Sequence, residues 1–343
     1  MSAIDRHGNT PAMSADPLET AANWLETELA VALATVARTW GSSPVPAGGQ
    51  MVIAAEDRFA GSVSGGCIEA EVITAALDVI RDGVPRRMDF GVANETAWRA
   101  GLPCGGNVSV MVSRLKRAEA GDLLSRILAA RQQRQRIVVL TDVVSGAMEV
   151  LCEHDARSTA EAEWFARETI DFIARPMGEV FVHAIAPPPR VIVVGAAHIA
   201  QHLVAALDQL RYEAIVVDPR TAFATPERFP RTRIVSSWPA EALGSIGIDR
   251  HTAVVALAHV PDIDDPALAT ALGSEAFYVG ALGSTRNHAR RRDRLLATGL
   301  APDLIDRIHA PAGLDIGALT PAEIALSIAA EIVLRRRGPR RTA

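Results

Sequence analysis

Two cysteines of this chain lie in glycine-flanked turns, where a side chain has few neighbours that could bury it. Cys67 follows Gly65-Gly66, and Cys104 precedes Gly105-Gly106. The thiolate form of cysteine is a nucleophile and a ligand for soft metals. Glycine turns also let backbone N–H groups approach an anion closely. The two turns therefore predict a site for an anionic, sulfur-containing cofactor, with simple packing of either thiol as the alternative.

The turn at Cys67 leads into a predicted helix. Apolar residues recur at helical spacing from Ile68 to Ile80, and Gly83 follows them as a stop signal. This spacing places Cys67 in the first turn, where the helix dipole favours a thiolate or a bound anion. Glu69 is interpreted as a first-turn acid that complements the same dipole.

The length and charge of the chain limit the classes of protein to consider. A chain of 343 residues is expected to form two domains. Its net charge of −5 argues against nucleic acid as a partner, and the run Arg290-Arg291-Arg292 is interpreted as a solvated helix face. We find neither a signal peptide nor an uncharged stretch long enough to cross a membrane. We therefore expect a cytoplasmic protein without a membrane partner.

The numbers and positions of the cysteines and lysines argue against further classes of protein. The cysteines Cys67, Cys104 and Cys152 have no zinc-site spacing and are expected to be free thiols, with Cys152 in a packing role. Lys116 is the only lysine, and it follows no glycine-rich loop. Phosphate-loop nucleotidases and enzymes that form a Schiff base both need a lysine in a specific setting. The sequence supports neither class.

The first predicted domain is an α/β domain over residues 18–115. A buried strand is predicted over 30–39, and Met51–Ala55 with Phe59–Val63 forms a predicted hairpin. The Gly65-Gly66 turn comes directly after this hairpin. A further strand is predicted near Met88–Val92.

Residues 116–189 are predicted to be a connecting segment. Their pattern indicates a charged helix to Arg136, a strand over Ile137–Leu140 and a helix around Glu161–Ile173. Pro187-Pro188-Pro189 stiffens the end of the segment as a linker would. No motif that carries chemistry occurs in it.

The third region, residues 190–338, opens with a strand, a tight turn and a helix, as dinucleotide-binding folds do. Gly195 and Ala200 match the first and last positions of the GxGxxG/A pattern, but Ala197 replaces its central glycine. That glycine lets the backbone approach a pyrophosphate, so the pattern supports a Rossmann-like fold more firmly than it supports NAD binding. His198, in the same turn, either contacts a ligand or simply caps the helix or faces solvent.

Repeated strand and helix units follow, which indicates a doubly wound parallel sheet. Strands are predicted over Ala253–Ala258 and Phe277–Leu282, and a helix is predicted to begin near Asp265. The last helix has Thr320 as its N-cap, with Glu323 completing a capping box.

Several polar residues of this region are candidate ligands. Asp218 ends a strand where an acid would meet a ribose hydroxyl, or it pairs with Arg220 instead. Gly283-Ser284 precedes the helix that carries Arg286, which makes this turn an anion-binding candidate. His259 lies at the carboxyl end of a strand, where open α/β sheets bind their ligands.

At this point the chain resembles the xanthine dehydrogenase accessory protein family, XdhC/CoxI. The matching segments occur in order along both halves: 41–44, 61–69, 104–106, 194–198, 217–220, 278–284 and 309–317. The resemblance implies an N-terminal XdhC/CoxI-type α/β domain and a C-terminal Rossmann-like doubly wound parallel sheet.

The same resemblance implies an accessory protein, more a cofactor chaperone than a catalyst. Such a protein binds the molybdenum cofactor, of the molybdopterin type, and assists its sulfuration and its insertion into a xanthine dehydrogenase-like molybdenum hydroxylase. The family's paired cysteines correspond to Cys67 and Cys104, as contacts to the cofactor and its metal. The implied partners are the hydroxylase apoprotein and a cysteine desulfurase as sulfur donor, and a homodimer is expected on general grounds.

The chain departs from the family pattern at three positions. Ala197 replaces a glycine, Val260 follows His259 where an aspartate is common, and Ala312 stands within the usual Pro-Ile-Gly. The alternative function is an NAD(P)- or nucleotide-dependent oxidoreductase that uses the second Rossmann-like half. In that alternative His198 or His259 is the catalytic proton donor.

Overall fold

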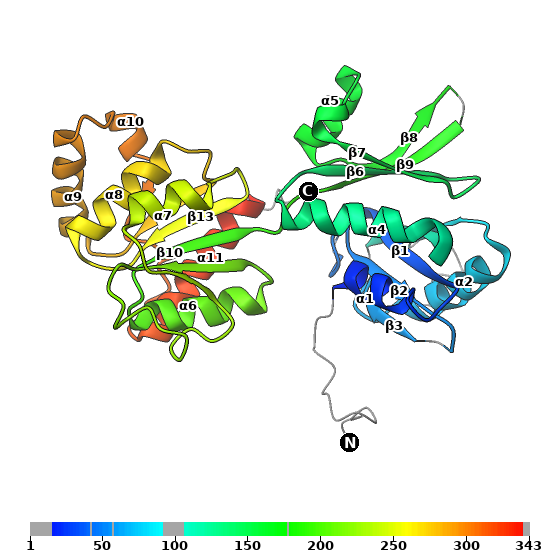
Figure 1. Cartoon of the computed structure of the whole chain (residues 1–343), viewed down its shortest axis with the longest axis horizontal. Helices are drawn as coiled ribbons and strands as arrows, with labels where there is room; N and C mark the ends of the chain where they lie inside the picture. The colour runs from blue at the N-terminus through cyan, green and yellow to red at the C-terminus, as the bar shows by residue number, and fades with distance from the viewer. Residues whose placement is uncertain (1–15, 42, 57, 92–105, 177, 339–343) are drawn as a thin grey trace. The chain divides into compact units, whose positions relative to one another are not determined.

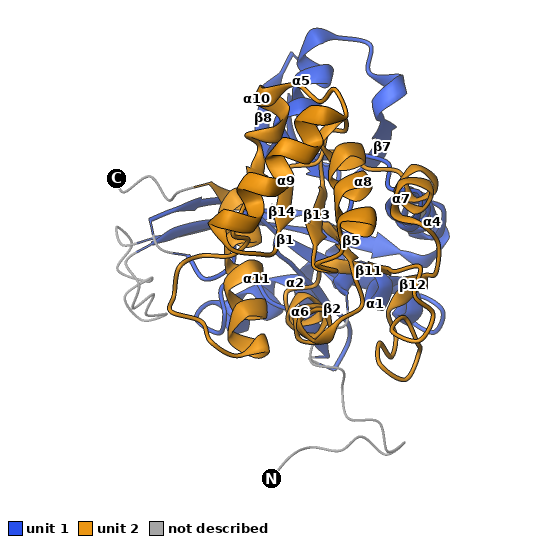
Figure 2. Cartoon of the chain, turned by 90° about the vertical axis from the view of Figure 1, so that its left-hand side faces the viewer, with its two compact units in different colours: residues 1–187 blue, residues 188–343 orange. Residues whose placement is uncertain are grey.

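The computed structural model of the chain describes residues 16–41, 43–56, 58–91, 106–176 and 178–338. Two compact units make up the chain, residues 1–187 (unit 1) and residues 188–343 (unit 2), which Figure 2 shows in different colours. The break falls inside the Pro187-Pro188-Pro189 run. Each unit is described by itself below.

Unit 1 begins with a five-stranded antiparallel sheet in the order β3-β2-β1-β5-β4. Its strands are β1 (Ala30–Trp40), β2 (Gln50–Ile53), β3 (Phe59–Gly61), β4 (Arg86–Phe90) and β5 (Asn107–Lys116). Alternate residues of β1 face opposite sides, as the two-residue period of a strand requires. Helix α2 (Glu69–Asp82) packs on one face, while α1 (Pro17–Trp24) and α4 (Arg117–Gln132) pack on the other.

The predicted connecting segment is itself folded, and its residues up to Pro187 belong to unit 1. After α4 it forms a second antiparallel sheet, in the order β7-β6-β9-β8. The elements are β6 (Ile137–Asp142), β7 (Met148–Cys152), the short 3₁₀ helix η1 (Glu153–Asp155), α5 (Thr159–Arg167), β8 (Ile170–Arg175) and β9 (Gly178–Ile185). Apolar residues of α4, such as Leu124 and Ile127, share one buried cluster with Ile137 and Val139 of β6.

The helix predicted around Glu161–Ile173 is wrong in its second half. Helix α5 ends at Arg167, and Glu168 follows in the left-handed conformation with φ 50°. The chain then enters β8, which pairs with β9 along its whole length. Phe172 is buried there against Phe181 of β9. Tertiary pairing therefore overrides the local helical pattern.

Unit 2 is a six-stranded parallel sheet in the order β12-β11-β10-β13-β14-β15. Its strands are β10 (Arg190–Val194), β11 (Glu213–Val217), β12 (Arg233–Val235), β13 (Thr252–Ala256), β14 (Tyr278–Ala281) and β15 (Ile308–His309). The helices are α6 (His198–Gln209), α7 (Pro239–Ile246), α8 (Pro261–Leu272), α9 (Thr285–Ala297), α10 (Pro302–Ile305) and α11 (Pro321–Arg337).

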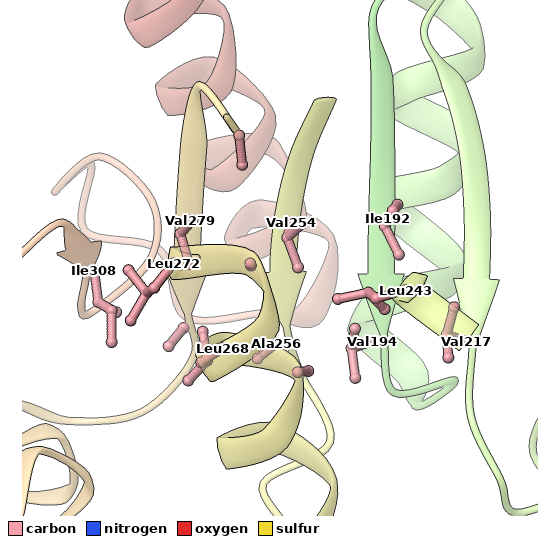
Figure 3. Close-up of a cluster of buried hydrophobic side chains, with 14 of the residues drawn as sticks. Ile192, Val194, Val217, Leu243, Val254, Ala256, Leu268, Leu272, Val279 and Ile308 are labelled. Atoms are coloured by element: carbon pink, nitrogen blue, oxygen red, sulfur yellow. The ribbon is translucent and has the colours of Figure 1, made fainter. Parts of the chain in front are cut away.

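Helices cover both faces of this sheet, which confirms the doubly wound Rossmann-like fold (Figure 1). Figure 3 shows one core, in which Leu268 and Leu272 of α8 lie against Val254 and Val279 of the sheet. Helices α6 and α11 cover the other face and pack against each other. The strand order reverses between β10 and β13, and open sheets of this kind bind ligands beyond the carboxyl ends of their strands at such a reversal.

The predicted ends of two helices in unit 2 can be compared with the structure. Thr320 caps α11 and Glu323 completes its capping box, as predicted. The predicted start of α8 near Asp265 is wrong, because the helix begins at Pro261, the residue type favoured at a first helical position. Among the described residues, no helix is long and apolar enough to cross a membrane.

Candidate functional site

The carboxylate of Glu69 fills the turn that precedes α2. It accepts hydrogen bonds from two hydroxyls and five backbone N–H groups: Ser62 Oγ (2.6 Å), Ser64 Oγ (2.5 Å), Val63 N (3.2 Å), Ser64 N (2.9 Å), Gly65 N (3.1 Å), Gly66 N (2.9 Å) and Ile68 N (3.2 Å). Burial by itself would raise the pKa of Glu69. The hydrogen bonds from Ser62, Ser64 and the backbone outweigh it and hold that pKa at about 2.

Glu69 is therefore more than a first-turn acid that complements a helix dipole. The N–H groups of Gly65 and Gly66, predicted to hold a phosphate or an oxo ligand, already donate to it. An external anion would have to displace a carboxylate that makes charge-assisted hydrogen bonds. Binding of a cofactor by these two glycines stays a prediction.

Cys67 lies before α2 and not in its first turn, so that prediction is wrong. Ile68 is the N-cap, and the helix begins at Glu69. The Cys67 side chain is a half-buried free thiol that packs against the cluster under α2, and its N–H donates to Ser64 Oγ (3.0 Å). Its predicted partners Cys104 and Gly105 lie outside the described residues, while Gly106 is buried directly before β5.

Cys152 packs at the edge of a buried cluster, as its predicted role requires. It also lies beside His154 and Asp155, and the potential ligand atoms of the three side chains are within 4.8 Å of one another. His154 and Asp155 are exposed on the short helix η1. This grouping comes from adjacent positions in the sequence and has no part in the sites predicted above.

In unit 2 the Rossmann turn is held by packing and by one buried carboxylate. A Cβ atom on Gly195, whose φ is 103°, would lie only 2.5 Å from the backbone nitrogen of Ala258, so only glycine fits there. The N–H of Ala196 donates to Asp218 Oδ2 (2.7 Å). His198 is the first residue of α6 and is exposed, with its ring edge-on to His202.

Asp218 pairs with Arg220, which is the alternative that the sequence left open. The buried carboxylate accepts from Arg220 Nε (2.9 Å), Nη2 (2.7 Å) and backbone N (2.9 Å). Burial would raise the pKa of Asp218, but these hydrogen bonds and the one from Ala196 lower it. Both carboxylate oxygens are engaged within the protein. A ribose hydroxyl would have to compete with Arg220 and Ala196 for them.

A pocket of unit 2 lies at the carboxyl edge of its sheet and has a volume of about 520 Å³. Its lining comes from the loops that follow β13, β14 and β15 and from α6 and α11: Ile199, His259, Leu282, Gly283, Pro311, Ala312, Gly313, Leu314, Asp315, Ile316, Ala318, Ile324 and Ser327. The fold thus brings together His259 and Gly283 from the predicted set. Ser284 caps α9 through its hydroxyl, Arg286 is exposed, and neither belongs to this lining.

A buried charge network lies behind the His259 and Gly283 side of the pocket. Arg291 is only 4% exposed, so its interpretation as part of a solvated face is wrong. Its Nη2 donates to Leu282 O (3.0 Å) and lies 4.0 Å from Asp264 Oδ2. Asp264 Oδ1 in turn accepts from Ala258 N (3.1 Å), and burial raises the pKa of Asp264 to about 6.

Arg291 of this network also affects the protonation of His259. The residue has a φ of 57°, a left-handed conformation that is uncommon for histidine and recurs at functional sites. Partial burial of the ring and the charge of Arg291 lower the pKa of His259. The imidazole is therefore neutral at pH 7 and can both donate and accept a hydrogen bond.

The wall formed by the loop after β15 is held in place by Glu331 of α11, a residue that the sequence analysis missed. Its buried carboxylate accepts from Tyr278 OH (2.7 Å) and Gly313 N (2.7 Å), and His309 Nδ1 lies 3.0 Å from it. A Cβ atom on Gly313 would lie 2.3 Å from Ser327 Oγ, so the loop after β15 lies directly on α11. In the sequence, the resemblance of residues 309–317 to the family pattern was the signal that could have indicated this wall.

Comparison with known proteins identifies the family of this chain. Residues 24–91 match the family model described as XdhC and CoxI family. Residues 191–332 match the family model described as XdhC Rossmann domain. The chain belongs to the XdhC and CoxI family. The Gly65 to Glu69 turn lies in the first matched region and the whole pocket lining in the second, whereas Cys104 lies in neither.

Relatives in this family match nearly the whole chain. The Escherichia coli (strain K12) protein named molybdenum cofactor insertion chaperone PaoD is 27% identical over 300 residues, which cover 88% of this chain and 81% of that protein. A Bacillus subtilis (strain 168) protein, named as a probable xanthine dehydrogenase subunit, is 26% identical, covering 91% and 95%. A crystal structure from Bacillus halodurans, described as a xanthine dehydrogenase, is 25% identical, with a TM-score of 0.74 and coverage of 95% and 97%.

Proposed function

We propose that this XdhC/CoxI family member is an accessory protein that binds the molybdenum cofactor and assists its sulfuration and its insertion into a xanthine dehydrogenase-like molybdenum hydroxylase. The observation that carries the proposal is the pocket of about 520 Å³ at the carboxyl edge of the unit 2 sheet. It occurs in a chain related over most of its length to a protein named as a molybdenum cofactor insertion chaperone. The pocket has the position and the mostly apolar lining of a small-molecule site.

The residues present fit a ligand with apolar faces and charged ends. Leu282, Leu314 and Ile324 supply apolar surface, while His259 and Asp315 supply polar contacts. Bound there, the cofactor would bring the molybdenum centre that a hydroxylase uses. The contribution of this chain is to bind the cofactor, to limit its contact with water and to release it to the apoprotein.

Sulfuration needs a group that handles sulfur, and Cys67 is our candidate. Its thiol is free and only half-buried, so a sulfur donor such as a cysteine desulfurase could reach it. Cys104 is proposed as its partner on the family resemblance. Cys67→Ala should leave the chain folded and lower the sulfido content of the cofactor it delivers; an unchanged sulfido content would return Cys67 to a packing role.

The direct experiment is to purify the full chain from a host that makes the cofactor and to measure molybdenum and pterin together. We expect both in near-equal amounts with the protein. A preparation without molybdenum, combined with full hydroxylase activity in a strain that lacks this chain, would overturn the proposal. The proposed setting is the cytoplasm, with the apoprotein as partner and a symmetric homodimer as the working form.

A further inference from the structure

The turn that follows β7 brings three side chains of metal-ligand type together on the surface of unit 1. Cys152 is the last residue of β7, and His154 and Asp155 follow it on η1, before the start of α5 (Figure 1). One ligand atom from each side chain, a sulfur, a nitrogen and an oxygen, lies within 4.8 Å of the other two. Within the described part of the chain, three such ligand atoms come this close together only here.

The distances between these atoms are close to those of a tetrahedral zinc site. Zinc binds sulfur at about 2.3 Å and nitrogen or oxygen at about 2.0 to 2.1 Å, so its ligand atoms are about 3.4 to 3.6 Å apart. His154 Nε2 lies 3.5 Å from Asp155 Oδ1. The limit of 4.8 Å for the whole group leaves about 1 Å to close, which a rotation of the exposed His154 side chain supplies.

The backbone of the turn holds two of the three ligands in position. Asp155 Oδ2 accepts a hydrogen bond from Cys152 N (3.3 Å), and the Cys152 sulfur accepts one from the N–H of Asp155 in return. The other carboxylate oxygen, Oδ1, is the one that faces His154. Because two ligands are already ordered, an ion loses less of its binding free energy to conformational entropy.

The group is anchored on one side and open on the other. Cys152 is a half-buried free thiol that packs beside apolar residues of β6, such as Ile137. The side chains of His154 and Asp155 are 78% and 44% exposed. An ion can therefore reach all three ligands from solvent.

The mixture of ligand types determines which cation fits. A thiolate is a soft ligand, and neither a thiolate nor an imidazole suits Mg²⁺ or Ca²⁺, which bind oxygen. Zn²⁺ accepts sulfur, nitrogen and oxygen ligands in one site. The group lacks the paired Cys-x-x-Cys spacing of a closed structural zinc site. Three ligands within one turn instead leave a fourth position open for water.

We propose that Cys152, His154 and Asp155 form a binding site for Zn²⁺ on the surface of unit 1, with water in the fourth position. Bound Zn²⁺ ties the end of β7 to η1 and stabilises the folded chain by mass action. The alternative is an ion pair between His154 and Asp155 beside a packed cysteine. The two alternatives differ in whether the thiol takes part. The proposal does not depend on the accessory function proposed above.

The test is a titration of the full chain, purified without metal, with Zn²⁺ and with Co²⁺ as a spectroscopic substitute. Co²⁺ bound to a thiolate has a charge-transfer absorption band that nitrogen and oxygen ligands alone do not produce, so other histidine pairs, such as His198 and His202, do not contribute to it. We expect the band in wild type with about one Co²⁺ per chain, and its loss when Zn²⁺ but not Mg²⁺ is added. The Kd for Zn²⁺ should be about 1 μM or lower.

Three variants each remove one ligand. Cys152→Ser should abolish the charge-transfer band, and His154→Ala and Asp155→Asn should weaken binding of Zn²⁺ at least tenfold. Cys67→Ser and His202→Ala are the matched controls, a half-buried free thiol and an exposed histidine outside the group, and they should retain the band and the affinity. Circular dichroism shows whether each variant is folded.

Three results would overturn the site. The first is a band that survives in folded Cys152→Ser, because the thiolate would then belong to another cysteine. The second is equal affinity for Zn²⁺ in wild type and in the His154 and Asp155 variants. The third is binding of Zn²⁺ that is weaker than about 1 mM, which would mean an adventitious ion only.

Discussion

Two glycine turns, Gly65-Gly66 in unit 1 and the turn at Gly283 in unit 2, differ in whether the chain itself supplies an anion to their N–H groups. In unit 1 the N–H groups of Gly65 and Gly66 donate to Glu69, which the chain itself supplies. In unit 2 the Gly283 turn borders an open pocket, and the buried Arg291 behind it forms long ion pairs with Asp264 and Asp265. The turn of unit 1 is thus filled by the chain itself, whereas the turn of unit 2 borders the pocket that we propose as the ligand site.

The largest effect should come from removing the internal anion of the unit 1 turn. Glu69→Gln keeps the shape of the side chain but replaces a carboxylate that accepts seven hydrogen bonds. Solvent screening moderates the effect, so we expect the free energy of unfolding to fall by about 2 to 3 kcal/mol. Urea titration followed by circular dichroism measures it.

Glu71→Gln is the matched control for this change. Glu71 lies in the same first turn of α2 but is exposed, so its substitution should cost less than about 0.5 kcal/mol. Equal losses for the two variants would show that Glu69 acts only through the helix dipole, and the contrast between the two glycine turns would fail.

Acid should remove the same stabilisation. The pKa of Glu69 is about 2 in the folded chain, against an ordinary value of 4.5 for a glutamate. Because the folded value is the lower one, the stabilisation is fully present above about pH 4.5 and is lost as the pH falls toward 2. The stability difference between wild type and Glu69→Gln should therefore shrink over this range, and a difference that is constant with pH would contradict the assignment.

In unit 2, loss of the pairing between Asp218 and Arg220 should lower the free energy of unfolding by an intermediate amount. Asp218→Asn weakens the contacts with Arg220 and with Ala196 of the Rossmann turn, and we expect the free energy of unfolding to fall by about 2 kcal/mol.

Because Asp218 is already paired, calorimetric titration with NAD and NADP should detect no micromolar binding to wild type. Micromolar binding that Asp218→Asn abolishes would instead support the oxidoreductase alternative.

The smallest effect is expected at His198. This side chain is exposed at the start of α6 and does not belong to the pocket lining. His198→Ala should change the free energy of unfolding by no more than about 0.5 kcal/mol and should leave binding of the cofactor unchanged. A tenfold loss of binding would place the ligand on the Rossmann turn, away from the Gly283 wall.

The sequence predicted those parts of the fold that depend on local signals. The β10 strand and turn, and the capped start of α11, follow from hydrophobic runs, Gly195 and the Thr320–Glu323 pair, all readable within a few residues. Strand β8 was missed because its identity depends on pairing with β9. Its local pattern alone resembled the end of a helix.

The candidate site was predicted less completely, for a physical reason. Glu69 was visible as an acid after two glycines, but the direction of its side chain back into the turn was not. Arg291 stands in a run of arginines that is typical of a solvated face, and only the packing of α9 shows that it is buried. The pocket lining comes from loops after three strands, so Asp315 and His259 meet only in the folded chain.

The central claim is that the ligand binds in the unit 2 pocket and that the filled turn of unit 1 is structural. The molybdenum content of wild type, Asp315→Asn and Glu69→Gln, each purified as folded protein from a cofactor-producing host, tests it most directly. We predict that Asp315→Asn retains only about half of the metal, because a tenfold weaker affinity lowers the occupancy of a nearly filled site to about one-half, while Glu69→Gln retains it. Full molybdenum in Asp315→Asn together with loss in Glu69→Gln would contradict the claim.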